Sequence, residues 1–177
     1  MNWTARIVIT AFVSAAVAGG LSLLPKLDQY AGAPSSQAWS TGRSAQLTSD
    51  NLVDLLVQVP LQLRIRKVEL SDSILFIDLS LPKNADAATV YRDLYTIAQT
   101  MNAKTKNVNQ VMVRVMDYAG SADSSSAQLV LAMVADREHG KDLKEKASEL
   151  TQVQLERQLI DRFRLTYTTR WQQRYPL

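Results

Sequence analysis

The chain has 177 residues, of which 46% are hydrophobic and 21% are charged, and its formal net charge is +3. These proportions are typical of a protein that buries a core, and the charge excess is too small to indicate a nucleic-acid partner. Cysteine is absent and histidine occurs once, which excludes disulfides, thiolate nucleophiles and zinc ribbons. No phosphate-binding loop or metal-ligand motif occurs, so we expect no cofactor.

The first feature along the chain is residues 7–24, which carry no charge and follow a short start that contains Arg6. As a helix this segment would span roughly 27 Å, close to the ~30 Å hydrocarbon core of a bilayer. We favour an uncleaved anchor because apolar residues continue through Leu24. The alternative is a signal peptide that is cleaved after Ala18. Either way we expect the rest of the chain outside the cytoplasm, held at the cell membrane by a single pass or secreted after cleavage.

Behind the anchor, residues 25–47 are rich in Ser, Ala, Gly and Pro and have no hydrophobic period, which is typical of a flexible tether. Residues 48–177 have the size of one domain. We therefore predict three parts: the anchor or signal segment (1–24), the tether (25–47) and an extracytoplasmic domain (48–177).

The residue pattern in the first half of this domain predicts a helix, two strands and a second helix. The first helix begins at Thr48 or Ser49 as N-cap and ends at Pro60, with an apolar stripe that includes Val53. Alternation predicts strands at 61–66 and 74–81, joined by a turn at 71–73, and the pattern slips at Lys67, which indicates a bulge or the approach to the turn. A long helix follows over 86–102, with Asn84 as its cap.

The second half predicts strands at 111–116 and 128–135, separated by a polar loop, and then a surface helix that begins at Lys141 after the break at Gly140. The fold class is therefore α+β, in the order α-β-β-α-β-β-α. We expect an N-terminal transmembrane helix followed by a four-stranded, mostly antiparallel sheet packed by helices. The order suggests a doubled αββ unit, although the two halves share no convincing residue identity.

The end of the chain fits two patterns. Residues 162–171 alternate like a strand, yet Leu159, Phe163, Tyr167 and Trp171 also step by four like a helix face. Arginine binds phosphate and carboxylate groups in pairs of hydrogen bonds, and aromatic rings suit interfaces, so a mixture of the two is a candidate site for an anionic partner. The simpler interpretation, which we favour, is an amphipathic element with a buried aromatic side and solvated arginines. The candidate contacts are Arg162, Arg164, Arg170, Trp171, Arg174 and Tyr175.

Few residues suggest chemistry. His139 lies among charged residues with no nucleophile motif nearby, so we interpret it as a solvated loop histidine. Asp78 lies in an otherwise apolar strand and, without a partner at a fixed spacing, is expected to be a half-exposed sheet residue. Ser49-Asp50-Asn51 and Ser80 with Lys83 match two elements of penicillin-binding serine enzymes, but in the wrong order and without the third.

We therefore expect a non-enzymatic protein, anchored in the membrane, that acts by protein–protein interaction or self-assembly at the cell envelope. The alternative is a binder of anionic envelope polymer or lipid through the C-terminal tail.

Overall fold

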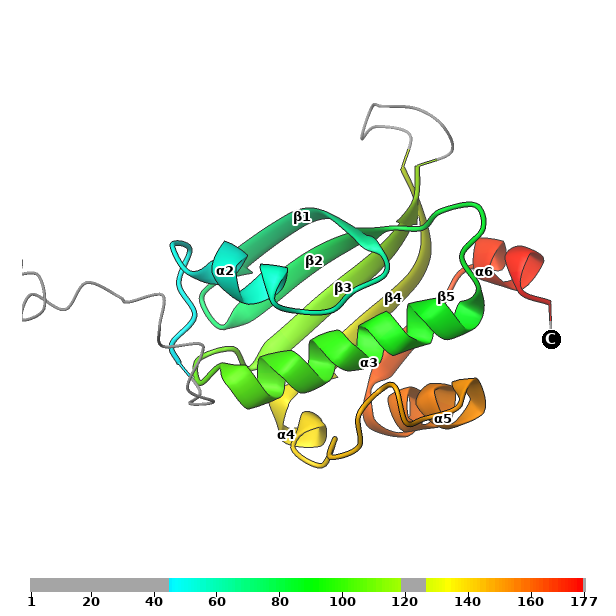
Figure 1. Cartoon of the computed structure of the whole chain (residues 1–177). Coiled ribbons are helices and arrows are strands. Elements are labelled where there is room, and N and C mark those ends of the chain that lie inside the picture. The colour runs from blue at the N-terminus through cyan, green and yellow to red at the C-terminus, as the bar shows by residue number, and fades with distance from the viewer. Residues whose placement is uncertain (1–44, 119–126, 177) are drawn as a thin grey trace, which may run out of the picture. The chain divides into compact units, whose positions relative to one another are not determined.

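The computed structural model describes residues 45–118 and 127–176, which are called the body below (Figure 1). They form a mixed α+β fold in which helices pack on a five-stranded sheet. The elements are α2 (Leu52–Val57), β1 (Arg64–Ser71), β2 (Ile74–Ser80), α3 (Ala87–Lys104), β3 (Gln110–Asp117), β4 (Gln128–Asp136), α4 (Arg137–Gly140), α5 (Gln152–Arg162), β5 (Arg164–Tyr167) and α6 (Thr169–Arg174).

The strands lie in the sheet in chain order, β1-β2-β3-β4-β5. Neighbours are antiparallel except for β2 and β3, which are parallel because α3 carries the chain back to the starting end of the sheet. The prediction of four strands was wrong by one, since part of the tail adds β5 at the β4 edge. The predicted order from the first helix to the fourth strand is confirmed.

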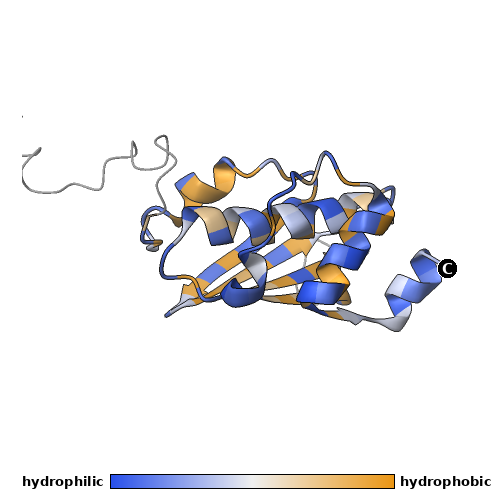
Figure 2. Cartoon of the chain, turned by 90° about the horizontal axis from the view of Figure 1, so that it is seen from below, coloured by the Kyte–Doolittle hydropathy of each residue, from blue (hydrophilic) through white to orange (hydrophobic). Residues whose placement is uncertain are grey.

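Among the described helices, the longer ones, α3 and α5, lie on one face of the sheet (Figures 1 and 2). The strand residues that point toward them are apolar and fully buried, as at Leu75, Ile77 and Val113. Leu94 and Ile97 of α3 meet these side chains in a single hydrophobic cluster. The opposite face of the sheet is uncovered by any described element and carries the outward residues of each strand.

The region of α2 and β1 differs from the prediction in detail. Asn51, not Thr48 or Ser49, is the N-cap of α2, and Val53 is 64% exposed instead of lying in the buried stripe. The strand begins at Arg64, three residues later than predicted, but the register shift between Ile65 and Lys67 confirms the predicted irregularity. The predicted hairpin turn is also confirmed, with Asp72 at φ 51°, a left-handed conformation that aspartate tolerates.

The long helix α3 matches its prediction except for the cap. Asp86, not Asn84, is the N-cap, and its side chain accepts a hydrogen bond from the Thr89 N–H at 2.7 Å. The N–H groups of the first turn have no partner inside the helix, so the acceptor has to sit at the residue directly before the helix.

The single surface helix predicted from Lys141 was wrong. The short α4 ends at Gly140, no regular helix covers residues 141–151, and α5 begins at Gln152. A capping box between Thr151 and Gln154 fixes this later start. The preceding segment is held on α3 instead, because Gln99 donates to the carbonyls of Leu143 and Glu145 at 2.9 and 2.8 Å.

The two patterns of the tail are both present, one after the other. Residues 164–167 form strand β5 and residues 169–174 form helix α6. The change occurs at Thr168, whose hydroxyl donates to the Val130 carbonyl at 2.8 Å and which stands as the N-cap of α6.

The predicted membrane segment and nearly all of the predicted tether lie outside the described residues. Within the body, no helix combines the length and the apolar character that a membrane crossing requires. At the start of the body, Ala45 pairs with Thr105 and Leu47 is buried, so these two residues pack on the fold.

Candidate functional site

The structure distributes the six candidate tail residues over three elements. Arg162 ends α5, Arg164 lies on β5, and Arg170, Trp171 and Arg174 belong to α6, with Tyr175 as its C-cap.

The four arginines have different surroundings. The side chain of Arg162 is 29% exposed and lies 3.7 Å from the Asp142 carboxylate. Arg174 donates to the Pro82 carbonyl, so its guanidinium is used within the body. Arg164 and Arg170 are exposed. Two of the four cations are therefore presented to solvent, while the other two are engaged by the fold.

The aromatic residues of the tail come together around Trp171, which is 6% exposed. Its ring centroid lies 5.4 Å from that of Tyr91, 5.5 Å from Tyr167 and 4.5 Å from Tyr175, all in tilted arrangements that favour ring contacts. An apolar pocket of about 390 Å³ opens beside this cluster, between α3, α5 and α6. The sequence grouped Trp171 and Tyr175, but Tyr91 joins them from a helix eighty residues earlier.

The tyrosine hydroxyls of this cluster are hydrogen-bonded. The Tyr91 hydroxyl donates to the Glu156 carboxylate at 2.8 Å and lies 3.4 Å from that of Tyr167. Burial, together with these hydrogen bonds, raises the pKa of Tyr91 well above its ordinary value, and burial also raises the pKa of Tyr167 and Tyr175. The three phenols therefore stay neutral at physiological pH and act as packing and hydrogen-bonding groups.

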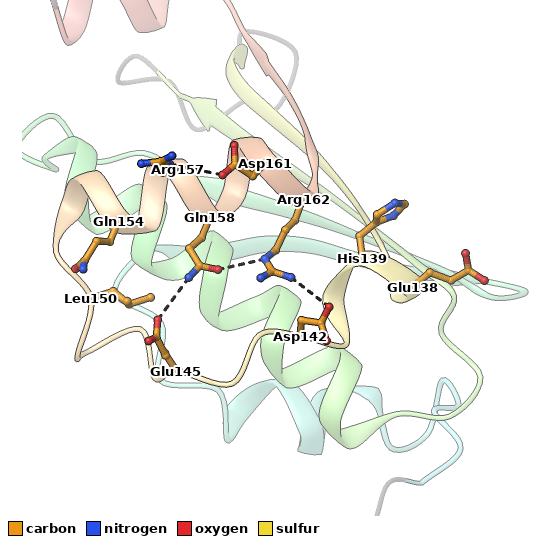
Figure 3. Close-up of a pocket in the computed structure, with 10 residues that line it drawn as sticks. All are labelled: Glu138, His139, Asp142, Glu145, Leu150, Gln154, Arg157, Gln158, Asp161 and Arg162. Atoms are coloured by element: carbon orange, nitrogen blue, oxygen red, sulfur yellow. Dashed lines mark hydrogen bonds and ion pairs between the residues drawn. The ribbon is translucent and has the colours of Figure 1, made fainter.

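A second, charged cavity of about 560 Å³ lies between α4, α5 and the 141–151 segment (Figure 3). Its charges are largely paired with one another: Arg162 with Asp142, and Arg157 with Asp161 at 3.7 Å. His139 is exposed on α4, not in a loop as predicted, and points away from the Arg162–Asp142 pair in Figure 3. Among the described residues, no three acidic or histidine side chains are placed to hold a metal ion.

The third candidate is the edge of the sheet at β1. An apolar groove of about 420 Å³ separates this strand from α2, and Leu56, Ile65 and Val68 are among its lining residues. Val53 and Val57 of α2, which also line the groove, are 64% and 80% exposed. No described strand lies beyond β1, so the main-chain groups on its outer side have no strand partner in the described part of the chain, and the apolar groove lies beside this edge.

Asp78 is not the half-exposed residue that was predicted. It is 8% exposed, and both of its carboxylate oxygens accept from Arg114, from Nε at 2.7 Å and from Nη2 at 2.7 Å. This bidentate pair raises the pKa of Arg114. Arg114 lies opposite Asp78 because β2 and β3 are parallel, a register that strand alternation alone does not reveal.

Two further polar anchors were missed at the sequence level. Asp93 is fully buried in α3 and accepts the main-chain N–H groups of Gln62 and Leu63, which immediately precede β1. Arg137 donates to the carbonyls of Thr105 and Val108 at 2.6 and 2.7 Å. It therefore hydrogen-bonds the C-cap of α3 and the segment that follows it. Asp93 had one visible signal, a carboxylate on the apolar side of a helix, whereas Arg137 had none.

Comparisons with protein-family models, with curated proteins and with solved structures find no significant match to this chain.

Proposed function

We propose that this chain is a non-enzymatic, single-pass membrane protein whose body acts outside the cytoplasm in protein–protein interaction or assembly at the cell envelope. The observation that carries the interaction role is the open β1 edge beside the exposed valines of α2. The membrane role rests on the uncharged segment 7–24.

The β1 edge suits a protein partner for two reasons. Its outer main-chain groups offer a row of hydrogen bonds to an added strand, and the groove under α2 offers an apolar pocket for that strand's side chains. The other edge, β5, is only four residues long, whereas β1 has eight. A short edge limits pairing, so β1 is the better template.

The non-enzymatic part of the proposal is supported by how the polar groups of the body are used. In the charged cavity Arg162 and Asp142 are paired, and in the aromatic pocket Tyr91 and Glu156 share a hydrogen bond. These contacts hold elements of the fold together, which is a structural use of ionisable groups.

A crosslinking experiment in intact membranes tests the interaction role. Val57→Asp places a charge in the groove, and we expect the crosslinked species of the wild-type chain to be lost. Val153→Asp is the matched control, because Val153 is 73% exposed on α5, away from β1. Crosslinked species that persist in the Val57→Asp variant, or their loss in both variants, would remove the support for this surface.

Membrane fractionation tests the anchor. We expect the full chain to remain with the membrane after alkaline extraction and its N-terminal peptide to include residues 7–24. A mature N-terminus directly after Ala18 would show that the segment is a cleaved signal and the body is secreted.

A second candidate function, the binding of anionic polymer or lipid, is favoured by the exposure of Arg164 and Arg170. We expect such binding to weaken steeply with salt and to be reduced when both arginines are replaced by glutamine. Arg157→Gln is the control, since Arg157 is 82% exposed but belongs to α5. Equal binding by the double variant and the control would rule this candidate out.

A further inference from the structure

We infer that the partner at the β1 edge is a second copy of this chain, paired antiparallel through β1 about a two-fold axis at Val68. This inference rests on the proposed interaction role and specifies its partner. It joins the two five-stranded sheets into one continuous sheet.

The hairpin shows which main-chain groups of β1 are available. Ser71 and Ile74 flank a two-residue turn, so they form the hydrogen-bonded pair that closes the hairpin. Hydrogen-bonded and non-hydrogen-bonded pairs then alternate along antiparallel strands. Leu70 pairs with Leu75 and Val68 with Ile77 in the non-hydrogen-bonded positions, so the N–H and C=O groups of Leu70 and Val68 point away from β2.

Charge selects the register of a symmetric pair. With Val68 opposite Val68 of the second copy, Lys67 of each copy lies opposite Glu69 of the other, and unlike charges attract across both positions. An axis at Lys67 would place two lysines opposite each other, and an axis at Glu69 would place two glutamates opposite each other. The Val68 register is also the one in which the outward main-chain groups of Val68 exchange hydrogen bonds directly.

The two charged side chains are already arranged for this pairing. The Lys67 Nζ lies 2.9 Å from the Glu69 carboxylate, and both side chains are largely exposed, at 65% and 58%. They point to the uncovered face of the sheet, because their β2 partners are Asp78 and Phe76. In the dimer the two intramolecular pairs combine into one alternating network of four charges.

The same register adds apolar side chains beside the groove. Val68 and Ile65 point to the helical face of the sheet and line the groove beneath α2. A second β1 strand laid beside the first puts its own Val68 next to the first Val68, on the face where the exposed Val53 and Val57 also line the groove. Hydrogen bonds, charge and apolar burial therefore favour the same arrangement.

Two single variants and their mixture test the inference on the full chain in detergent micelles, with oligomeric state measured by analytical ultracentrifugation. Lys67→Glu and Glu69→Lys each place like charges opposite each other, and we expect each to dimerise at least about tenfold more weakly than wild type. Mixed together, they regain opposite charges at both cross-strand positions. We therefore expect the mixture to form a heterodimer near wild-type strength, although neither chain regains its internal Lys67–Glu69 pair.

A monomeric wild-type chain, single variants that dimerise like wild type, or a mixture that stays monomeric would each overturn the inference. Such a result would leave the proposed interaction role standing if crosslinking in membranes still captured a different protein in a Val57-dependent way. If the chain neither dimerises in micelles nor gives Val57-dependent crosslinks in membranes, the β1 edge is rejected as an interaction surface.

Discussion

Asp93 is the side chain through which α3 holds the beginning of β1. Its carboxylate accepts the Gln62 N–H at 2.9 Å and the Leu63 N–H at 2.6 Å, and Leu63 is only 3% exposed. Asp93→Ala leaves the Leu63 N–H buried without an acceptor, which costs about 1–3 kcal/mol, while the more exposed Gln62 N–H can turn to water at about 1 kcal/mol. Part of this cost is offset, because the variant no longer has to bury a carboxylate. We expect a net loss of about 2–3 kcal/mol in the free energy of unfolding.

Urea unfolding followed by far-ultraviolet circular dichroism measures this loss. With a slope of about 1.5 kcal/mol per molar urea, the midpoint should fall by roughly 1.3–2 M. Asp93→Asn is the control, because its amide keeps one acceptor oxygen and should lose about half as much. An Asp93→Ala midpoint within about 0.3 M of wild type would show that these hydrogen bonds do not hold the strand.

The same residue gives the stability a defined pH dependence. Burial raises the pKa of Asp93 above its ordinary value of 3.8. Between pH 3.8 and the raised folded pKa, the folded protein keeps a proton on Asp93 that the unfolded chain has lost. The contribution of Asp93 to stability is therefore full below about pH 3.8 and declines as the pH rises through the folded pKa. The stability difference between wild type and Asp93→Asn should therefore be larger in acid than at neutral pH, and a difference that grows toward neutral pH would contradict this sign.

Three further predictions concern caps and the tail. Asp86→Ala removes the N-cap of α3 and should cost about 1 kcal/mol. Because hydrogen bonds from Thr89 lower the pKa of Asp86, this cost should be present above pH 3.8 and disappear as the pH falls through the folded pKa, as urea midpoints across pH can show. Trp171→Ala should lower the free energy of unfolding by about 3–4 kcal/mol, whereas Arg170→Ala, at an exposed position, should change it by less than about 0.5 kcal/mol. Equal effects of the two variants would show that the aromatic cluster is not part of the core. Arg137→Ala leaves the carbonyls of Thr105, the C-cap of α3, and of Val108 without their donor and should cost about 2 kcal/mol, with faster hydrogen exchange in the last turn of that helix.

Local patterns predicted the strands and the long helix well. In each of β2, β3 and β4 the residues divide into two alternating rows, and one row supplies buried core side chains, as at Ile77, Val113 and Met133. This works because side chains on a strand point to opposite faces in turn, so a sheet with one covered face leaves its mark on every strand. The turn at Asp72 was also visible, since its signal is local.

The segment after Gly140 shows where local patterns fail. Leu143, Ala147 and Leu150 are buried as their apolar character suggests, yet they are not in a helix. They pack into the core while hydrogen bonds from Gln99 and Tyr95 of α3 to the carbonyls of Leu143 and Glu145 hold the segment against that helix. Such partners lie more than forty residues away and have no counterpart in a local period.

Periodicity could not decide whether the tail is a strand or a helix, because its residues fit both the two-residue period of a strand and the four-residue step of a helix. Strand pairing with β4 uses its first part, and contact of Trp171 with Tyr91 uses its second. The outcome was thus settled by which surfaces of the fold were available, namely the open edge of β4 and the end of α3.

The sequence by itself determined the α+β class, the order of the first six elements of the body, the inward faces of its strands and the proposal of a membrane anchor. The tertiary structure alone decided the fifth strand, the partnership of Asp78 with Arg114, the anchoring of β1 by Asp93 and the exposure of the groove beside that strand. The physical reason is the range of the interactions. Periodicity records which side of one element meets the core, whereas strand partners, ion pairs and open edges depend on how separate elements pack together, and for Asp78 and Asp93 the partners lie thirty or more residues away.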